Sequence, residues 1–481
     1  MHILKILLII VLLFTWPNKF GNIDQQLLRE LGPADRIQIY SDNNWYWQYK
    51  QQPVLLIGAS NEDNLWNRPG DSVEAELDDL ISIKQGESSP IMFYVRNTMS
   101  SRDFGNVWWF RKDDNGLYDL NTFEQEYWAR FENFLKMTSR RNIIVQIEVF
   151  DRFDFARGTW ANENPFNPAN NNTYTASESG LEARYSQHPG ENENLFFYSV
   201  PDLENNHVIL PYQHAIVDKL MEVSLPYGNV LYCISNETNG APEWGEYWAS
   251  RIRQKAAEAG KEVEVTEMWD SREVYNDQHL STINLHDLYT YVDISQNNHK
   301  NAQEHWDNMI ASRNIISVKP RPMNNVKIYG ADEGEYHGKS AEEATRRLWR
   351  NTFAGMASSR FHRPPHGIGL STLAKTHLRS MHLFTTEFDV FNAIGHNYYI
   401  NNRSSDEAYG MTNRYNQYAV YFPDDGSVNL DIQEGNYSVH WLNILESRWQ
   451  NSTDVTTDGS EITLSTPAEG QWVVLVKREP D

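Results

Sequence analysis

The chain has 481 residues, a length that favours one large α/β unit with a smaller appended domain. Forty per cent of the residues are hydrophobic and 13% are aromatic, which excludes a chain that is disordered as a whole. The formal net charge of −23 excludes nucleic-acid backbone binding as the main activity, because most of such a surface repels a polyanion. The single cysteine, Cys233, excludes a disulfide framework.

The N-terminus has the pattern of an export signal. Lys5 precedes an apolar run over residues 6–14, which is short for a membrane span and typical of a secretory signal. We expect residues 1–21 to be a signal peptide and the mature protein to be secreted, with the periplasm as its compartment and no stable membrane insertion. An uncleaved anchor is the alternative, because no A-x-A site follows the run.

Short apolar runs and longer amphipathic stretches alternate from residue 53 onward, as strands and crossover helices do. Eight such runs are present, which is the strand count of a TIM barrel. We therefore predict an α/β fold, a (β/α)8 TIM barrel over residues 22–393. The eight predicted strands lie in residues 53–60, 90–97, 142–154, 229–237, 262–270, 288–298, 322–330 and 357–365.

Two other regions differ from this alternation. The Asn-rich stretch 161–206 follows the third strand and is too long for a plain connection, so we expect a substrate-binding loop there. After residue 393 the pattern changes to short alternating strands with turn residues. This predicts a small C-terminal antiparallel β-sandwich over residues 394–481.

Active sites of TIM barrels lie at the C-terminal ends of the strands, so the residues at those ends are the candidates. Few of them are apolar here. They include Arg96 and Asn97, Asp151, Arg152 and Asp154, Asn236 and Glu237, Glu267, Trp269 and Asp270, Asp293, Gln296 and Asn297, Asn325, Lys327 and Tyr329, and Arg360, His362, Arg363 and His366.

The pair Asn236 and Glu237 at the end of the fourth strand resembles the acid/base signature of the large TIM-barrel glycosidase clan. In that clan Asn contacts the sugar hydroxyl beside the scissile bond and Glu donates the proton, which implies these roles for Asn236 and Glu237. The C-terminal segments 418–432, 437–441 and 472–476 also resemble the small β-domain, named for collagen binding, of bacterial glycosidase-like barrels.

The seventh strand departs from the clan pattern. A retaining glycosidase needs a second carboxylate roughly 5 Å from the first, and the clan supplies it from this strand end. Here Val326 or Lys327 occupies the position, and Glu333 and Glu335 follow a few residues later. A retaining hydrolase using Glu237 with Glu333 or Glu335 is therefore one alternative, and an inactive glycan-binding barrel is another.

The cationic strand ends instead favour an anionic ligand, because a cleft with concentrated positive charge in an acidic protein attracts carboxylate or sulfate. On a uronic acid such a site can carry out β-elimination. We expect Lys327, Tyr329 or His362 to be the base and Glu237 the acid. The expected substrate-binding residues are Asn236, Asn325, Arg360, Arg363, Arg96, Arg152 and Trp269.

The segments 324–330 (NNVKIYG) and 360–367 (RFHRPPHG) and the Asn-rich, acidic composition resemble marine-bacterial oligosaccharide dehydratases of the ulvan-degradation type. The resemblance implies a secreted barrel that removes water from the non-reducing-end uronic acid of an acidic oligosaccharide, leaving a 4,5-unsaturated residue. We expect no cofactor and no metal, since no H-E-x-x-H motif, cysteine cluster or glycine-rich phosphate loop is present in the sequence.

Overall fold

The computed structural model describes residues 32, 35–69, 72–84, 89–99, 107–331, 333–414 and 417–479. The predicted signal peptide, residues 1–21, lies outside these ranges. Within them, no helix combines the length and the apolar character of a membrane span.

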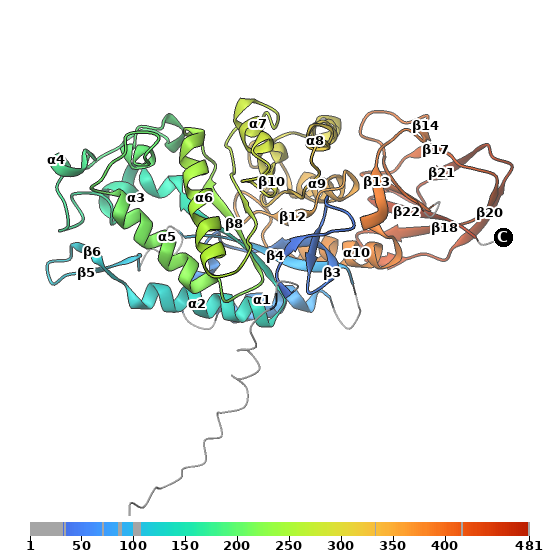
Figure 1. The fold of residues 1–481 in the computed structure, drawn as a ribbon. Helices are drawn as coiled ribbons and strands as arrows, with labels where there is room; N and C mark the ends of the chain where they lie inside the picture. Colours follow the sequence, from blue (N-terminus) through green and yellow to red (C-terminus); the bar gives the residue numbers. More distant parts are fainter. Residues whose placement is uncertain are drawn as a thin grey trace, which may run out of the picture.

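A curled sheet of parallel strands forms the larger part of the molecule (Figure 1). Its parallel strands pair in the order β12, β3, β4, β7, β8 and β9. The strand that comes last in the chain, β12, therefore pairs with β3, the first parallel strand. Strands β10 and β11 pair with each other in a separate parallel ladder. The bounds are β3 Gln52–Ala59, β4 Ile91–Thr98, β7 Ile144–Asp151, β8 Val230–Asn236, β9 Val265–Thr266, β10 Val292–Asp293, β11 Met323–Asn324 and β12 Ser358–Phe361.

Each of the eight predicted strands thus has a counterpart, and the fold is α/β. Among the described residues, however, no strand ladder joins β9 to β10 or β11 to β12, although Ile328, which follows β11, forms an isolated bridge with Phe361 of β12. Complete closure into an eight-stranded barrel therefore stays a prediction. Two short strands, β1 (Gln38–Ile39) and β2 (Trp47–Tyr49), extend the sheet antiparallel to β3.

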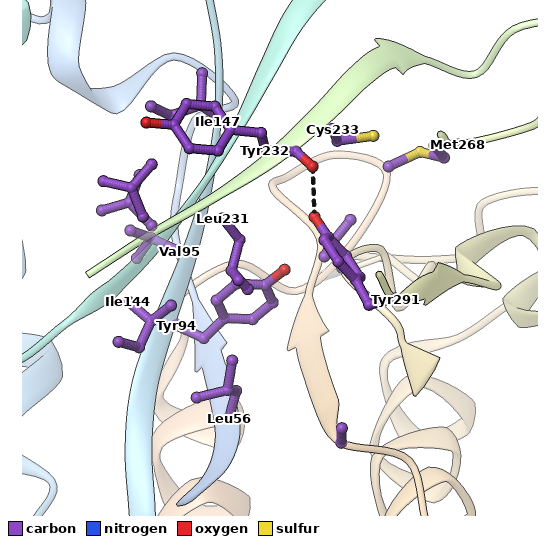
Figure 2. Packing of buried hydrophobic residues seen from close by; sticks show 14 of the residues in the cluster. Leu56, Tyr94, Val95, Ile144, Ile147, Leu231, Tyr232, Cys233, Met268 and Tyr291 are labelled. Atoms are coloured by element: carbon purple, nitrogen blue, oxygen red, sulfur yellow. Dashed lines mark hydrogen bonds between the residues drawn. The ribbon is translucent and has the colours of Figure 1, made fainter. Parts of the chain in front are cut away.

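The central strands are buried on both faces and are largely apolar, although they also carry buried polar residues such as Arg96 and Glu148. Every residue of β7 and of β8 is buried. Gly58 in β3 is required by a close approach, since a Cβ there would lie 1.9 Å from the carbonyl oxygen of Tyr94 in β4. Figure 2 shows the packing at the centre, where the Tyr291 hydroxyl donates a hydrogen bond of 2.9 Å to the Tyr232 carbonyl. Cys233 is buried in this core.

The helices are amphipathic crossovers that follow the strands. In α2 (Gln125–Arg140), for example, Tyr127, Phe131, Phe134 and Leu135 share one buried face, as a period of 3.6 requires. The sequence pattern did not predict the helix α7 (Asp277–Asn284). The other helices are α1 Ser72–Ser82, α5 Leu210–Ser224, α6 Pro242–Glu258, α7 Asp277–Asn284, α8 Ala302–Ile316, α9 Ala341–Phe353 and α10 Thr372–Glu387.

The Asn-rich insert folds into short helices joined by turns, and much of its asparagine content serves its own backbone. The Asn167 side chain donates to the carbonyls of Trp160 (2.8 Å) and Ala183 (3.0 Å), and Asn171 donates to that of Pro165 (3.1 Å). The short elements here and elsewhere are η2 Leu65–Asn67, β5 Phe110–Lys112, β6 Tyr118–Phe123, η3 Arg152–Phe155, α3 Arg157–Asn162, α4 Ala176–Ser179, η4 Pro189–Glu191, η5 Leu195–Tyr198, η6 Ser295–His299 and η7 Val390–Asn392.

The C-terminal part consists of antiparallel sheets, drawn at the right of Figure 1. Its inner core includes Phe422, Leu430 and Val474. The larger sheet also packs on the helices, where Tyr421 stacks on Trp349 of α9 at 5.6 Å. The larger sheet contains β13 Ala393–Gly395, β15 Tyr409–Asn413, β16 Gln417–Phe422, β18 Gly435–Asn443, β19 Arg448–Trp449, β20 Thr453–Thr457 and β22 Trp472–Arg478; the smaller contains β14 Ile400–Asn401, β17 Ser427–Asp431 and β21 Glu461–Ser465.

Candidate active site

Glu237 directly follows β8, and its backbone turns sharply there. Its φ is +52°, in the left-handed region that residues other than glycine seldom occupy. This conformation costs about 1–2 kcal/mol, and such strain is concentrated at functional sites. The Glu237 side chain is 15% exposed, so it is largely enclosed while keeping some contact with solvent.

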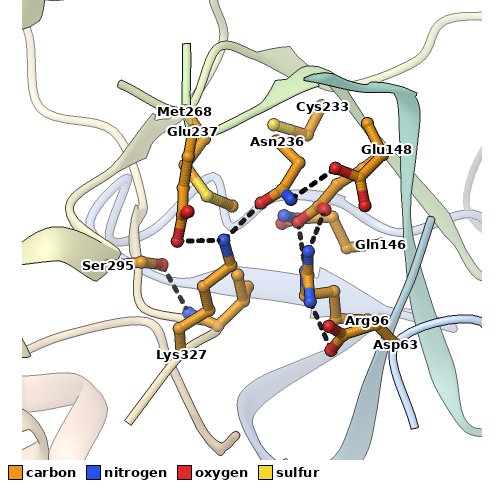
Figure 3. Close-up of polar contacts among 12 residues, drawn as sticks. Asp63, Arg96, Gln146, Glu148, Cys233, Asn236, Glu237, Met268, Ser295 and Lys327 are labelled. Atoms are coloured by element: carbon orange, nitrogen blue, oxygen red, sulfur yellow. Dashed lines mark hydrogen bonds and ion pairs between the residues drawn. The ribbon is translucent and has the colours of Figure 1, made fainter. Parts of the chain in front are cut away.

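Three donors converge on one carboxylate oxygen, Oε1 of Glu237. They are the Lys327 ammonium at 2.6 Å, the Tyr329 hydroxyl at 2.6 Å and the Gln296 amide at 2.8 Å (Figure 3 shows the first). Burial alone would raise the pKa of Glu237, but the charge and hydrogen bond of Lys327 outweigh it and hold that pKa well below its usual range. Glu237 is therefore ionised at neutral pH, and the predicted role as proton donor would require that a substrate displaces Lys327.

Asn236 holds this ion pair in place from the end of β8. Its amide nitrogen donates to Oδ1 of Asp151 at 2.9 Å. Its amide oxygen accepts a hydrogen bond from Lys327, as Figure 3 shows. The register of β7 and β8, which pairs Asp151 with Asn236, brings the two strand ends together. The structure thus joins Asn236, Glu237, Lys327 and Tyr329 in one cluster, as the strand-end pattern predicted.

Aromatic rings surround Tyr329. The rings of His299, Tyr336 and His362 lie with their centroids 4.2, 5.9 and 5.3 Å from that of Tyr329. Burial, and then the charge of Glu237, raises the pKa of Tyr329 well above its ordinary value, so the phenol keeps its proton. Burial lowers the pKa of His362 well below its ordinary value, so at neutral pH this imidazole is neutral.

Buried carboxylates compensate part of the predicted cationic cluster. Arg96 is fully buried; it binds Glu148 through Nε at 2.6 Å and Asp63 through Nη1 at 2.5 Å (Figure 3). Arg363 also binds Asp63, at 2.6 Å. The sequence interpretation had counted these cations without Asp63 and Glu148, so the local positive charge is smaller than it implied. Substrate binding by Arg96 or Arg363 stays a prediction.

Arg360, Asn325 and Trp269 are buried, and each binds a protein group. Arg360 donates to the carbonyl of Val326 at 3.0 Å, and Trp269 donates to the hydroxyl of Thr282 at 2.8 Å. Asn325 accepts a hydrogen bond from Asn298. These polar groups have hydrogen-bond partners within the protein and hold the strand ends together. Contact of these three residues with substrate stays a prediction.

The loop after Tyr329 carries Glu333 and Glu335, and both are exposed. Lys327 instead occupies the position facing Glu237, with its side chain 2% exposed. Another strand-end carboxylate, Asp270, lies close enough to Glu237 for the two charges to interact. Burial, and then the charge of Glu237, raises the pKa of Asp270, whose Oδ2 accepts a hydrogen bond of 3.1 Å from Asn239.

Gln296 was among the strand-end candidates from the sequence but was given no role, and His299, which directly follows the predicted sixth strand, was not named; both lie in η6. A polar run directly after a buried strand was the available signal. Tyr336 had no such signal, since it reaches the Tyr329 ring from a loop.

No protein-family model matches this chain, and no curated protein matches its sequence. The chain is similar in structure to a glycoside hydrolase family 5 protein from Bacteroides vulgatus, with a TM-score of 0.61 and 12% identity, over 92% of this chain and 94% of that one. A second structure, described as a glycoside hydrolase, has a TM-score of 0.61 and 12% identity over 93% and 98% of the two chains. The chain therefore has a glycoside-hydrolase-like α/β fold.

Proposed function

We propose that this protein is a carbohydrate-active enzyme whose reaction centre consists of Glu237, Lys327 and Tyr329. The shared fold supports a sugar substrate by analogy, and the strained, largely enclosed Glu237 at a strand end supports the place of the chemistry. We include the closed eight-stranded barrel in the proposal. It is supported by backbone hydrogen bonds across both gaps, from Thr290 to Val265 and from Ala357 to Met323, each 2.9 Å.

The reaction we propose is elimination of water from the non-reducing-end uronic acid of an acidic oligosaccharide, as the ulvan-type resemblance implies. One observation carries it: an ammonium, that of Lys327, lies 2.6 Å from Glu237 where double displacement would need a carboxylate. Elimination needs no nucleophile. It needs a base near C5, a proton for the leaving oxygen and positive charge near the substrate carboxylate.

The protonation states suggest which residues take these roles. His362 is the base that removes the C5 proton, because its imidazole is neutral. The electron pair forms the C4–C5 double bond, and the C4 oxygen leaves as water with a proton from Lys327. Lys327 suits this step better than Tyr329, because a phenolate would form 2.6 Å from the Glu237 carboxylate.

Incubation with acidic oligosaccharides, followed by mass spectrometry and ultraviolet absorbance, tests the proposal. We expect loss of one water from an intact chain together with a new absorbing double bond. Lys327→Met and His362→Asn should each lower the rate by at least 100-fold, a loss of general acid or base catalysis, while exposed Lys319→Met should not. Binding without any turnover would identify an inactive glycan-binding barrel instead.

Glycoside hydrolysis is the second candidate, and it is favoured by the fold of the similar structures and by Asp270. Environments that push two carboxyl pKa values apart often mark an acid and a base or nucleophile. Here the pKa of Glu237 is lowered and that of Asp270 is raised. Shorter, saturated products that Asp270→Asn abolishes would establish this reaction, whereas Glu333→Gln and Glu335→Gln test the partners that the sequence suggested.

Export to the periplasm also remains our proposal. Sequencing the N-terminus of the protein recovered from the periplasm tests it, and a mature chain starting near residue 22 is the expected result.

A further inference from the structure

The segment that carries Lys327 pairs with a strand on only one side among the described residues. β11 pairs with β10 over two residues and ends at Asn324. Towards β12 the backbone pairing continues, since the N–H of Ile328 donates to the carbonyl of Arg360 at 2.8 Å. On the other side the chain leaves the ladder after Asp293 and winds into η6. The backbone at Lys327 therefore needs other partners there, because buried main-chain groups are costly to leave unpaired.

Two side chains of η6 take the place of a strand on that side. The Ser295 hydroxyl accepts a hydrogen bond of 2.8 Å from the N–H of Val326. The amide nitrogen of Asn298 donates to the carbonyl of Lys327 at 2.9 Å and to that of Ser295 at 3.0 Å. Ser295 and Asn298 are fully buried, so water does not compete for these hydrogen bonds. Asn298 therefore fixes the main chain directly at Lys327.

His305, near the start of α8, orients the Asn298 amide. Its Nε2 lies 3.1 Å from Oδ1 of Asn298. Carbonyl oxygens only accept, so the amide nitrogen must face the carbonyls of Lys327 and Ser295, and the amide oxygen must face the ring. Burial, and then the charge of Arg350, lowers the pKa of His305 well below its ordinary value, so the ring is neutral and carries its one proton on Nε2. The direction of each hydrogen bond from His305 to Lys327 is thus defined.

The same short element holds both members of the central ion pair. Gln296 donates to Glu237 at 2.8 Å, while Asn298 fixes the main chain of Lys327. The Lys327 ammonium lies 2.6 Å from Glu237 (Figure 3), and the Lys327 side chain is only 2% exposed. Proton transfer needs a donor and an acceptor within about 2.6–3.2 Å, and a displacement of about 1 Å can lower a rate about 100-fold. A shift of the backbone at Lys327 would therefore change the reaction centre.

We propose that Asn298, oriented by His305, is a positioning residue that holds Lys327 against Glu237. Asn298 acts through Lys327, because it is too deeply buried to touch a substrate. The catalytic consequence rests on the proposed function, whereas the geometry can be measured without a substrate. Two measurements therefore separate the positioning role from the reaction.

A double-mutant cycle in urea denaturation measures how strongly Lys327 and Glu237 are coupled. The cycle consists of Lys327→Met, Glu237→Gln and the double variant, and it is repeated in an Asn298→Leu background. We expect the coupling to fall by at least half in that background, because the ammonium is no longer held in its place. A purely structural role would lower the stability of all members of the cycle alike and leave the coupling unchanged.

Asn229→Leu is the matched control. Asn229 is also fully buried, and its amide donates to a main-chain carbonyl, that of Ile143, at 2.7 Å. It directly precedes β8 and so lies at the end of that strand opposite to Glu237. Asn229→Leu should lower stability and leave the coupling between Lys327 and Glu237 unchanged.

Substitutions of His305 test the orientation of the Asn298 amide. His305→Gln keeps a donor near the place of Nε2 and should preserve the coupling, whereas His305→Leu removes the donor and should reduce the coupling as Asn298→Leu does. This pair of variants decides the question if Asn298→Leu does not fold.

Turnover of acidic oligosaccharides is the second measurement. Asn298→Leu should lower kcat by about tenfold or more and change KM by less than about threefold, while Asn229→Leu should leave both within about threefold of the native values. Unchanged coupling in Asn298→Leu and His305→Leu, or an equal loss of coupling in Asn229→Leu, would overturn the positioning role. If the coupling falls as expected and no sugar is turned over, the positioning role stands and the proposed reaction is refuted.

Discussion

Replacing Lys327 with Met tests the central ion pair through stability as well as activity. The substitution keeps the apolar stem and removes the charge 2.6 Å from Glu237. Breaking a buried pair costs about 3–5 kcal/mol. We expect the lower end, about 3 kcal/mol, since Glu237 keeps the hydrogen bonds of Tyr329 and Gln296. The double variant Glu237→Gln, Lys327→Met should recover part of this loss, because it leaves no unpaired charge.

The effect should depend on pH with a defined sign. In the native protein the pKa of Glu237 is lowered, so the pair stabilises the fold above the ordinary value near 4.5 and loses this effect as the pH falls through the lowered pKa. Without Lys327, burial raises the pKa of Glu237. The contribution of Glu237 to the stability of the fold is then present below about pH 4.5 and is lost as the pH rises through the raised pKa.

Urea denaturation at pH 7 and at pH 4.5 measures the stability cost of Lys327→Met and the dependence of that cost on pH. The gap in unfolding free energy between Lys327→Met and the double variant should be larger at pH 7. Lys319→Met, on an exposed side chain, should change stability by less than about 0.5 kcal/mol. A cost for Lys327→Met below about 1 kcal/mol at both pH values would refute the reasoning, because it would mean that Glu237 is well solvated.

Three further substitutions test the fold around the site. Gly58→Ala should lower stability by about 3 kcal/mol or more, because the new Cβ would collide with backbone atoms. This loss lies at or beyond the upper end of the usual 1–3 kcal/mol for overpacking, and thermal unfolding measures it. Trp349→Ala should cost about 3–5 kcal/mol, because it removes the stacking partner of Tyr421, and denaturation should then lose the joint transition of barrel and C-terminal sheets. Arg96→Met should cost about 3–5 kcal/mol by leaving Glu148 unpaired, whereas Arg96→Met with Glu148→Gln should be closer to the native protein in urea denaturation.

The strands and their order could be predicted because both faces of the sheet are buried, which produces continuous apolar runs such as residues 230–234 in β8. In a parallel sheet the polar residue that ends each run lies at the same edge. This is why Asn236, Glu237 and Lys327 meet although 91 residues separate the first from the last. For these three residues, membership of the cluster thus follows from the topology.

Charge compensation could not be predicted in the same way. Glu148 lies within β7, three residues before its end, and whether it faces Arg96 or a helix depends on the strand register. A slip of one residue would turn it to the other face. Asp63 lies in a loop, where no periodicity places a side chain. The cations of the site were therefore visible in the sequence, whereas the pairing of Arg96 and Arg363 with Glu148 and Asp63 was not.

This compensation bears on the substrate. Within the central cluster, Arg96, Arg363 and Lys327 are balanced by Asp63, Glu148 and Glu237, so the cluster contributes little to the net charge of −23. The excess negative charge belongs to the rest of the chain and repels a long polyanion. Under the proposed function, this charge distribution favours a short acidic oligosaccharide over a long acidic polymer.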